Sequence, residues 1–205
     1  MAVRFRSVGT VHTVMYVRDG NARDEAWLRE GIESMGLDDP AFRTDGYVIA
    51  VEETSDERAG FGRLRVHAGE PTIGELTTIG VYEPWRGQGV GAHIVERLLT
   101  KSGDAGCESA YILTDEPDYP TQFGFERCQE EELPEPLVDR RTEKQSVVDD
   151  ELVALRIDIE EFAMPPRFRE AFKTASPAGG EPTADDDEDF GIDAETATYK
   201  YDTGR

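Results

Sequence analysis

The sequence has few cysteines and no long apolar run. Its two cysteines, Cys107 and Cys128, are too few for a disulfide framework, and their spacing matches no zinc-binding pattern, so we expect buried free thiols. No segment is apolar enough to span a membrane, and residues 1–13 mix arginines and polar residues in a way that differs from a secretory leader. These absences favour a cytoplasmic protein.

Positive charge is also scarce. The chain has 22 Lys and Arg against 44 Asp and Glu, a formal net charge of −22, and its lysines are Lys101, Lys144, Lys173 and Lys200. A nucleic-acid partner needs a basic surface, so this balance argues against one. Because the acidic residues are spread over the whole chain, we interpret them as a halophilic surface, on which strong salt screens the repulsion between carboxylates. The alternative is that they attract cationic amines.

The most informative segment is Val81–Ala92, which contains Gly87, Gly89 and Gly91. The residues before it have the β-branched and apolar composition of a strand, and the apolar residues after it follow helical spacing. Glycines between a strand and a helix leave the backbone bare, so free N–H groups at the helix start can bind a phosphate. Arg86 adds a positive charge, and the segment therefore predicts an anion-binding loop.

Three kinds of loop have such glycines. A nucleoside-triphosphatase loop needs Lys followed by Ser or Thr, which this segment lacks. A dinucleotide loop is formally matched by Gly87-x-Gly89-x-x-Ala92, with Asp115 as a ribose ligand. That match is weak because its first glycine comes too late after the strand and only one strand–helix–strand unit follows.

The third kind fits best. The pattern Arg86-x-x-Gly89-x-Gly91, placed after a strand that ends at Val81, resembles the acetyl-CoA pyrophosphate loop of the GNAT superfamily of N-acetyltransferases. The resemblance covers roughly residues 43–127: residues 47–52 and 60–66 resemble the central hairpin of that family, 110–114 its fifth strand, and Phe123-Gly124-Phe125 the Gly-Phe after its last small helix.

This resemblance implies an α/β (α+β) protein with the GNAT fold, in which helices flank a central, mixed, mostly antiparallel and twisted sheet. We expect a GNAT domain over residues 1–174 and an acidic, flexible C-terminal tail over 175–205. The patterns predict strands at 11–17, 75–81 and 151–162, a hairpin within 43–66, and helices at 24–35, after the glycines, at 137–144 and at 167–174. The resemblance implies that the strands of the hairpin are 47–52 and 60–66 and that 110–114 is a strand.

The resemblance also implies acetyl-CoA as cosubstrate and no metal. The main chain of Ile79 and Val81 would bind the pantetheine arm, and Trp85 would anchor the loop to the core. The residues that it places around the pyrophosphate are Arg86, Gly87, Gln88, Gly89, Val90, Gly91 and Ala92.

Glu75 is the candidate general base. Histone-acetylating members of the superfamily have their catalytic glutamate at the same spacing from the strand end, six residues before Val81. Because the ordinary pKa of a glutamate is near 4.3, efficient proton transfer would require partial burial or a water relay. The alternative is a solvated glutamate that begins a strand.

Tyr119 is the candidate general acid. Many relatives have a tyrosine four residues before the glycine of Gly-Phe, where this chain has Pro120. Tyr119 stands one residue earlier, and a small helix distorted by the proline could still present its hydroxyl to the leaving thiolate. It could equally pack against the core.

The sequence thus predicts an N-acetyltransferase that acetylates an amine by direct attack on the thioester. The sequence does not identify the acceptor. A homodimer is one option for the assembly of the protein. The alternative is a CoA-binding sensor or interaction module with weak catalysis. His67 has no acid partner that the sequence identifies, and Arg140 with Arg141 either binds the adenosine 3′-phosphate or forms salt bridges within a helix.

Overall fold

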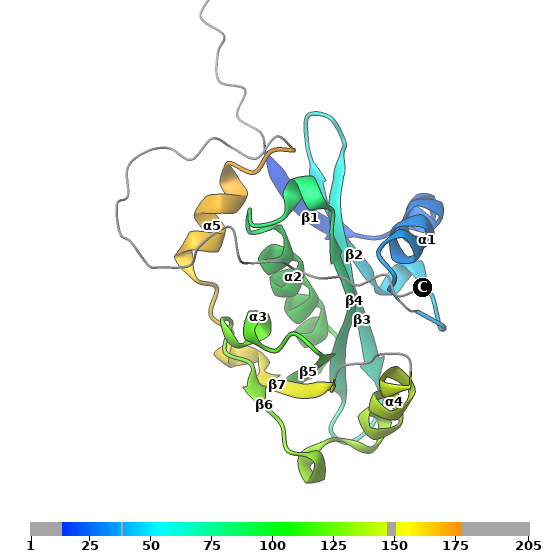
Figure 1. The fold of residues 1–205 in the computed structure, drawn as a ribbon. Helices are drawn as coiled ribbons and strands as arrows, with labels where there is room; N and C mark the ends of the chain where they lie inside the picture. Colours follow the sequence, from blue (N-terminus) through cyan, green and yellow to red (C-terminus); the bar gives the residue numbers. More distant parts are fainter. Residues whose placement is uncertain (1–13, 38, 147–150, 178–205) are drawn as a thin grey trace, which may run out of the picture.

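A seven-stranded sheet is the centre of the fold (Figure 1). The computed structural model describes residues 14–37, 39–146 and 151–177. The strands are β1 (Met15–Asp19), β2 (Tyr47–Glu52), β3 (Arg58–His67), β4 (Ile73–Val81), β5 (Ser109–Thr114), β6 (Glu126–Arg127) and β7 (Val153–Asp158). Their order in the sheet is β1-β2-β3-β4-β5-β7-β6, and the only parallel pair among them is β4–β5.

Helices flank both faces of this sheet (Figure 1). They are α1 (Glu25–Ser34), α2 (Val90–Asp104), α3 (Asp118–Thr121), α4 (Glu135–Gln145) and α5 (Pro166–Lys173). The apolar side of α2 packs on one face together with α5, whereas α1 and α4 each form a separate apolar cluster on the other face. The mixed, mostly antiparallel sheet with flanking helices confirms the predicted fold class.

The two strands of the parallel pair separate partway along their length. Their ladder runs from Ile73 opposite Ser109 to Leu76 opposite Ile112, and the described pairs end there although β4 continues to Val81. We call this separation the β4–β5 opening. It exposes main-chain groups of β4 that a neighbouring strand would otherwise bind.

A β-bulge in β4 coincides with this opening. Between two pairs with β3, Arg63 opposite Thr77 and Phe61 opposite Gly80, β4 has one residue more than β3. Thr78 has a φ of 49°, a left-handed conformation that is rare for a β-branched residue. The extra residue reverses the alternation of the strand: Leu76 packs on the side of α2 before the bulge, and Ile79 and Val81 pack on that side after it.

The predicted elements are present with small shifts at their ends. The predicted late strand at 151–162 is shorter because β7 ends at Asp158 and a 3₁₀ turn, Ile159–Glu161, follows. Residues 11–13 of the predicted first strand and residues 178–205 of the predicted tail lie outside the described residues. Cys107 is a buried free thiol as expected, whereas Cys128 is partly exposed.

Candidate active site

The glycine loop, which we define as residues 86–92, connects the end of β4 to α2. A short 3₁₀ turn, Glu83–Trp85, precedes it, and Trp85 is buried with its Nε1 donating to Oε1 of Glu57 at 3.1 Å. Gly87 and Gly89 have φ values of 72° and 74°, which a residue with a side chain adopts only with strain. Gly89 is the N-cap of α2, so the first N–H groups of that helix belong to the loop.

The basic residue of the loop supports its backbone. Arg86 is exposed, and its Nε donates to the carbonyl oxygen of Val81 at 3.1 Å. This hydrogen bond joins the strand end to the loop, and the guanidinium adds positive charge beside the N-terminus of α2. Glycine backbone, helix N-terminus and arginine together suit a phosphate group, and phosphate binding by this loop stays a prediction.

Helix α5 lies against the glycine loop. Gly89 is buried, and a Cβ built on it would lie 2.2 Å from the carbonyl oxygen of Phe168. The side-chain amide of Gln88 exchanges two hydrogen bonds with the backbone of Ser176, at 3.0 and 2.9 Å. The His93 ring stacks on Phe172 with 3.8 Å between centroids. The pattern of the sequence predicted α5 as a helix but gave no sign of these contacts.

Tyr119 lies across from the first turn of α2. A Cβ built on Gly91 would be 2.8 Å from the Tyr119 hydroxyl, and the Tyr119 ring packs edge-on against Phe123 and near Phe168. Pro120 is buried within α3 and does not prevent that helical turn from forming. The structure therefore brings Tyr119 and the glycine loop together.

Glu75 lies on the opposite face of the sheet and is fully buried. Its Oε2 accepts a hydrogen bond from Nε2 of His67 at 3.0 Å, and its Oε1 lies 3.7 Å from Nε of Arg140. Among the described residues, neither that Oε1 nor that Nε has a hydrogen-bond partner. The interpretation of Glu75 as a solvated residue is thus wrong: β3 and α4 enclose its carboxylate.

The surroundings of Glu75 keep it ionised. Burial acts to raise the pKa of Glu75, but the hydrogen bond from His67 and the charges of Arg140, Arg65 and Lys144 outweigh it, so the pKa is lowered. Burial is also the main cause that lowers the pKa of Lys144, whose Nζ donates to the carbonyl oxygen of Leu113 at 3.0 Å. The sequence analysis expected either partial burial that raises the pKa of Glu75 or a water relay. Glu75 is buried but its pKa is lowered, so the first of these two routes does not apply.

His67 is the residue near Glu75 that the sequence analysis missed. It ends β3 opposite Ile73, which places its ring diagonally across from Glu75 on the same face. The pair of His67 and Glu75 could have been predicted if the register between β3 and β4 had been known, because side chains on one face of neighbouring strands meet. The length of the turn between these strands does not determine that register.

Arg140 and Arg141 belong to α4, which covers the face of the sheet opposite α2 (Figure 1). Arg140 also pairs with Glu143 at 2.6 Å, and Arg141 lies 3.9 Å from Glu130. Of the two interpretations given above, the structure supports salt bridges rather than a site for the adenosine 3′-phosphate.

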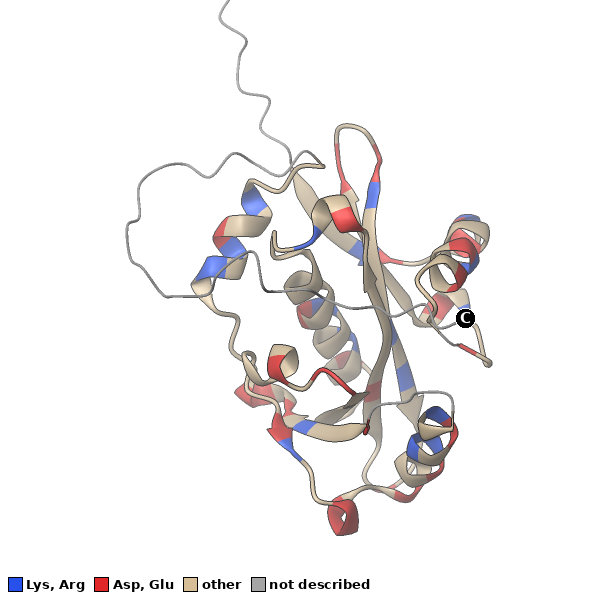
Figure 2. Ribbon diagram, viewed as in Figure 1, with Lys and Arg blue, Asp and Glu red and all other residues tan. Residues whose placement is uncertain are grey.

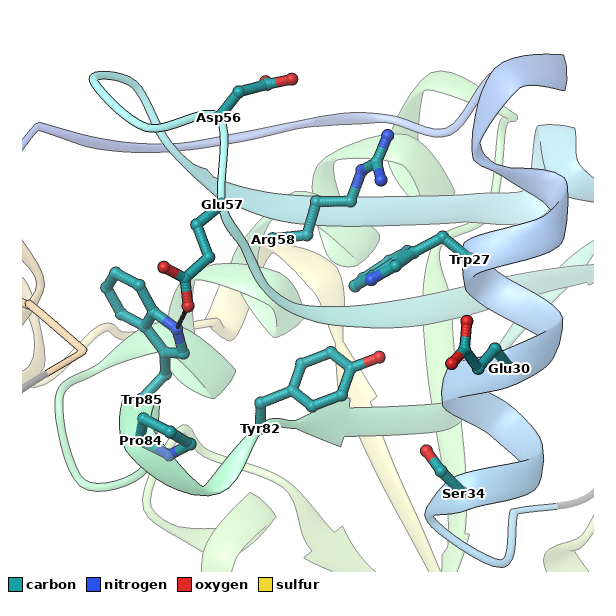
Figure 3. A pocket seen from close by; sticks show the side chains of 9 residues that line it. All are labelled: Trp27, Glu30, Ser34, Asp56, Glu57, Arg58, Tyr82, Pro84 and Trp85. Carbon is teal, nitrogen blue, oxygen red and sulfur yellow. Dashed lines mark hydrogen bonds between the residues drawn. The ribbon is translucent and has the colours of Figure 1, made fainter.

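A groove of about 530 Å³ lies between α1 and the end of β4 (Figure 3). Its walls come from α1, the β2–β3 hairpin and the turn before the glycine loop; the lining residues are Trp27, Glu30, Ser34, Asp56, Glu57, Arg58, Tyr82, Pro84 and Trp85. The Arg58 guanidinium lies 5.2 Å from the centroid of the Trp27 ring and 3.1 Å from Asp24. The groove is therefore on the same side of the sheet as α1.

Comparisons with known proteins agree with this architecture. The model of the acetyltransferase (GNAT) family matches residues 14–129. Mycothiol acetyltransferase of Thermobifida fusca is 32% identical over 100 residues, which cover 43% of this chain and 31% of that protein. The match thus spans less than a third of that relative.

Two solved structures share the fold. N-acetylglutamate synthase of Neisseria gonorrhoeae, in complex with coenzyme A and N-acetyl-glutamate, has a TM-score of 0.59 at 17% identity, covering 71% of this chain and 35% of that one. The protein Rv2747 of Mycobacterium tuberculosis, in complex with CoA, has a TM-score of 0.58 at 17% identity, covering 70% and 98%. The chain belongs to the GNAT family of acetyltransferases.

Within residues 14–37, 39–146 and 151–177, no group of three or more His, Cys, Asp or Glu side chains is arranged to hold a metal ion. None of the helices in this described part of the chain is both long enough and apolar enough to cross a membrane.

Proposed function

We propose that the protein is an N-acetyltransferase that transfers the acetyl group of acetyl-CoA to an amine by direct attack on the thioester. The observation that carries this proposal is the meeting of the glycine loop, the bulge of β4 and Tyr119 at the β4–β5 opening. An acyl thioester held along that opening would have phosphate-binding N–H groups at one end and unpaired strand backbone at the other.

The loop residues 86–92 would bind the pyrophosphate through backbone N–H groups at the start of α2. Ile79 and Val81 lie beyond the bulge, on the α2 side of β4, where their main chain can bond the pantetheine arm. A backbone N–H beside the thioester carbonyl would stabilise the negative charge that develops on its oxygen during attack. Supplied with acetyl-CoA, the site thus has groups for the pyrophosphate and for the thioester oxygen that becomes negative during attack.

Glu75 would accept a proton from the ammonium group of the acceptor through water, and the neutral amine would then attack the thioester carbonyl. Direct contact is disfavoured because its carboxylate is fully buried, but Oε1 keeps an unused lone pair beside Arg140. The lowered pKa of Glu75 keeps the carboxylate ionised at neutral pH, and it also makes Glu75 a weaker base than an ordinary glutamate. Tyr119 would donate a proton to the departing thiolate, since its hydroxyl lies over the first turn of α2.

The acceptor would approach from the side of α1 and α4. That face has the groove of Figure 3 and the carboxylate of Glu75, whereas α2 and α5 occupy the other face. We further propose a halophilic surface, because acidic residues occur on elements throughout the fold rather than on one side (Figure 2). A cytoplasmic location is proposed on the composition of the sequence alone.

Gly91→Asp tests the cosubstrate. Gly91 has a negative φ, and its new side chain would meet only the movable end of Tyr119 and Val81, so the fold should tolerate it. The added carboxylate should repel the pyrophosphate and weaken acetyl-CoA binding at least tenfold in calorimetry. Gly103→Asp is the matched control, since Gly103 is exposed on the same helix far from the loop. Folded wild-type protein that binds no acetyl-CoA would refute the proposal.

A CoA-binding sensor is the second candidate. The enclosure of Glu75 by β3 and α4 favours it, because a sealed carboxylate is poorly placed for an acceptor. A sensor would bind acetyl-CoA but release no CoA thiol when amines are added. Thiol release over a panel of amines, amino acids, polyamines and peptide N-termini separates the two candidates.

A further inference from the structure

We propose that α5 is a displaceable cover of the CoA site: α5 and the nucleotide end of acetyl-CoA compete for the space beside the glycine loop. This inference rests on the proposed binding of acetyl-CoA by the glycine loop. In the free protein the cover is closed, and binding of the cosubstrate lifts it.

The first support is the backbone of α5 over the loop. The Phe168 carbonyl approaches Gly89 so closely that a side chain there would overlap it, and Gly89 is buried although it belongs to a loop suited to phosphate. A carbonyl oxygen carries partial negative charge and would repel an anion bound against this side of Gly89. On the proposed assignment, a phosphate on this side of Gly89 and the Phe168 carbonyl exclude each other.

The second support is that α5 contacts both α2 and the segment that contains α3. On α2, Phe172 stacks against His93 and Arg169 pairs with Glu96 at 2.7 Å. The Phe168 ring lies 6.2 Å from that of Tyr119 in α3 and 5.4 Å from that of Phe123, which follows α3. A ligand that runs from the loop between α2 and α3 therefore has to pass beneath α5 or move it.

The third support is that α5 is weakly held. It has only eight residues, too few to be stable alone, and most of its side chains are exposed. Its ion pair with Glu96 is partly exposed, and exposed pairs contribute little. The remaining contacts are those of the Phe172 ring, the half-buried Phe168 ring, the small Ala175, and the hydrogen bonds Arg167–Gln122 and Gln88–Ser176. Only one large side chain of α5, that of Phe172, is therefore buried and would have to be exposed when the helix is displaced.

A closed cover lowers the apparent affinity for acetyl-CoA, because only the open fraction binds. If the cover is closed in about nine molecules of ten, its loss raises the affinity by roughly tenfold. The Gln88–Ser176 pair would break in the same step, since Gln88 belongs to the loop.

Hydrogen exchange of the wild-type protein with and without acetyl-CoA tests this inference. We expect slower exchange in residues 87–92 and faster exchange in 165–176 when acetyl-CoA is bound. Slower or unchanged exchange in 165–176 together with protection of 87–92 would overturn the cover and leave the proposed function intact. Absence of protection in both segments, with no binding heat, would overturn the proposed function as well.

Phe172→Ala gives a second, independent test. The change removes the stack on His93 and leaves every loop residue unchanged, so acetyl-CoA should bind about tenfold more tightly. Phe42→Ala is the matched control, because Phe42 packs with the cluster of α1 on the other face. Equal or weaker binding by folded Phe172→Ala would show that α5 is a wall of the site and not a cover.

Discussion

Single carboxylates of this acidic protein differ widely in their surroundings. Glu75 is enclosed by His67 and Arg140, whereas Glu52 accepts hydrogen bonds from the backbone N–H groups of Thr54 and Ser55 at 2.8 and 2.6 Å. The sequence alone does not distinguish these two glutamates. Because burial and hydrogen-bond partners determine the chemistry of a carboxylate, each glutamate needs its own prediction.

Glu75→Gln should lower kcat by about a hundredfold or more, since a general base contributes 10²–10⁴ in rate. Glutamine keeps the size of the side chain and can still accept from His67, so acetyl-CoA binding should stay within about twofold. Thiol-release kinetics and calorimetry measure the two quantities. Glu143→Gln is the control: it changes an exposed partner of Arg140 in α4 without changing Glu75, so it shows whether a disturbance of α4 alone lowers kcat. Unchanged kcat would remove Glu75 from the mechanism.

Glu52 gives a prediction about stability and pH. Hydrogen bonds from Ser55 and the backbone lower the pKa of Glu52 to about 2, below the ordinary value of 4.5. A lowered pKa in the folded state stabilises the protein above the ordinary pKa, and this contribution is lost as pH falls from 4.5 towards 2. Glu52→Gln should therefore cost about 1 kcal/mol of unfolding free energy at neutral pH.

Denaturant unfolding of Glu52→Gln at pH 7 and pH 3 checks this prediction. The difference from wild type should shrink at the lower pH, and the exposed neighbour variant Glu53→Gln should show little effect at either pH. A difference that grows on acidification would contradict the assigned role of the Glu52 carboxylate.

At the scale of elements, local patterns were enough for most helices and strands. The alternation of residues 153–157 and the helical spacing from Val90 to Leu99 depend on neighbours in sequence, and both elements form, the strand being shorter than the predicted 151–162. The bulge at Thr78 was not predictable, because it arises from the pairing of β3 with β4. The Gln88–Ser176 contact and the enclosure of Glu75 by α4 join residues far apart in the chain, which a single sequence does not specify.

Trp85→Phe tests how the glycine loop is anchored. The change keeps an aromatic ring in the core but removes the Nε1 hydrogen bond to Glu57. We expect a loss of about 1 kcal/mol of unfolding free energy and weaker acetyl-CoA binding, because the turn before the loop loses its attachment. Trp27→Phe, in the cluster of α1, should affect stability without weakening acetyl-CoA binding. Equal binding by wild type and Trp85→Phe would show that apolar packing alone positions the loop.

At the scale of the whole molecule, the large negative charge is the main feature that links stability to salt concentration. The formal net charge is −22, and carboxylates lie on the helices and strands of both faces (Figure 2). Most of the described ion pairs use arginine, and the few lysines contribute little compensation. Repulsion between carboxylates should therefore destabilise the fold in dilute salt.

The melting temperature should rise as KCl is increased from 0.1 to 3 M. The screening length falls from about 10 Å at 0.1 M to about 3 Å at 1 M, which removes most of the repulsion between surface carboxylates. Calorimetry over this range measures the effect. The same series in an uncharged osmolyte separates charge screening from the stabilisation that any solute excluded from the protein surface produces. A flat or falling melting temperature would argue against the halophilic interpretation.

The single extra residue in β4 has a consequence for the order of events at the site. Without it, Ile79 and Val81 would share a face with Glu75; with it, they lie on the other side of the sheet. On the proposed assignment, the acetyl donor and the acceptor then have separate entrances and meet only at the β4–β5 opening. Neither has to leave before the other arrives, so both can be bound together and the acetyl group can pass between them without first being stored on the protein.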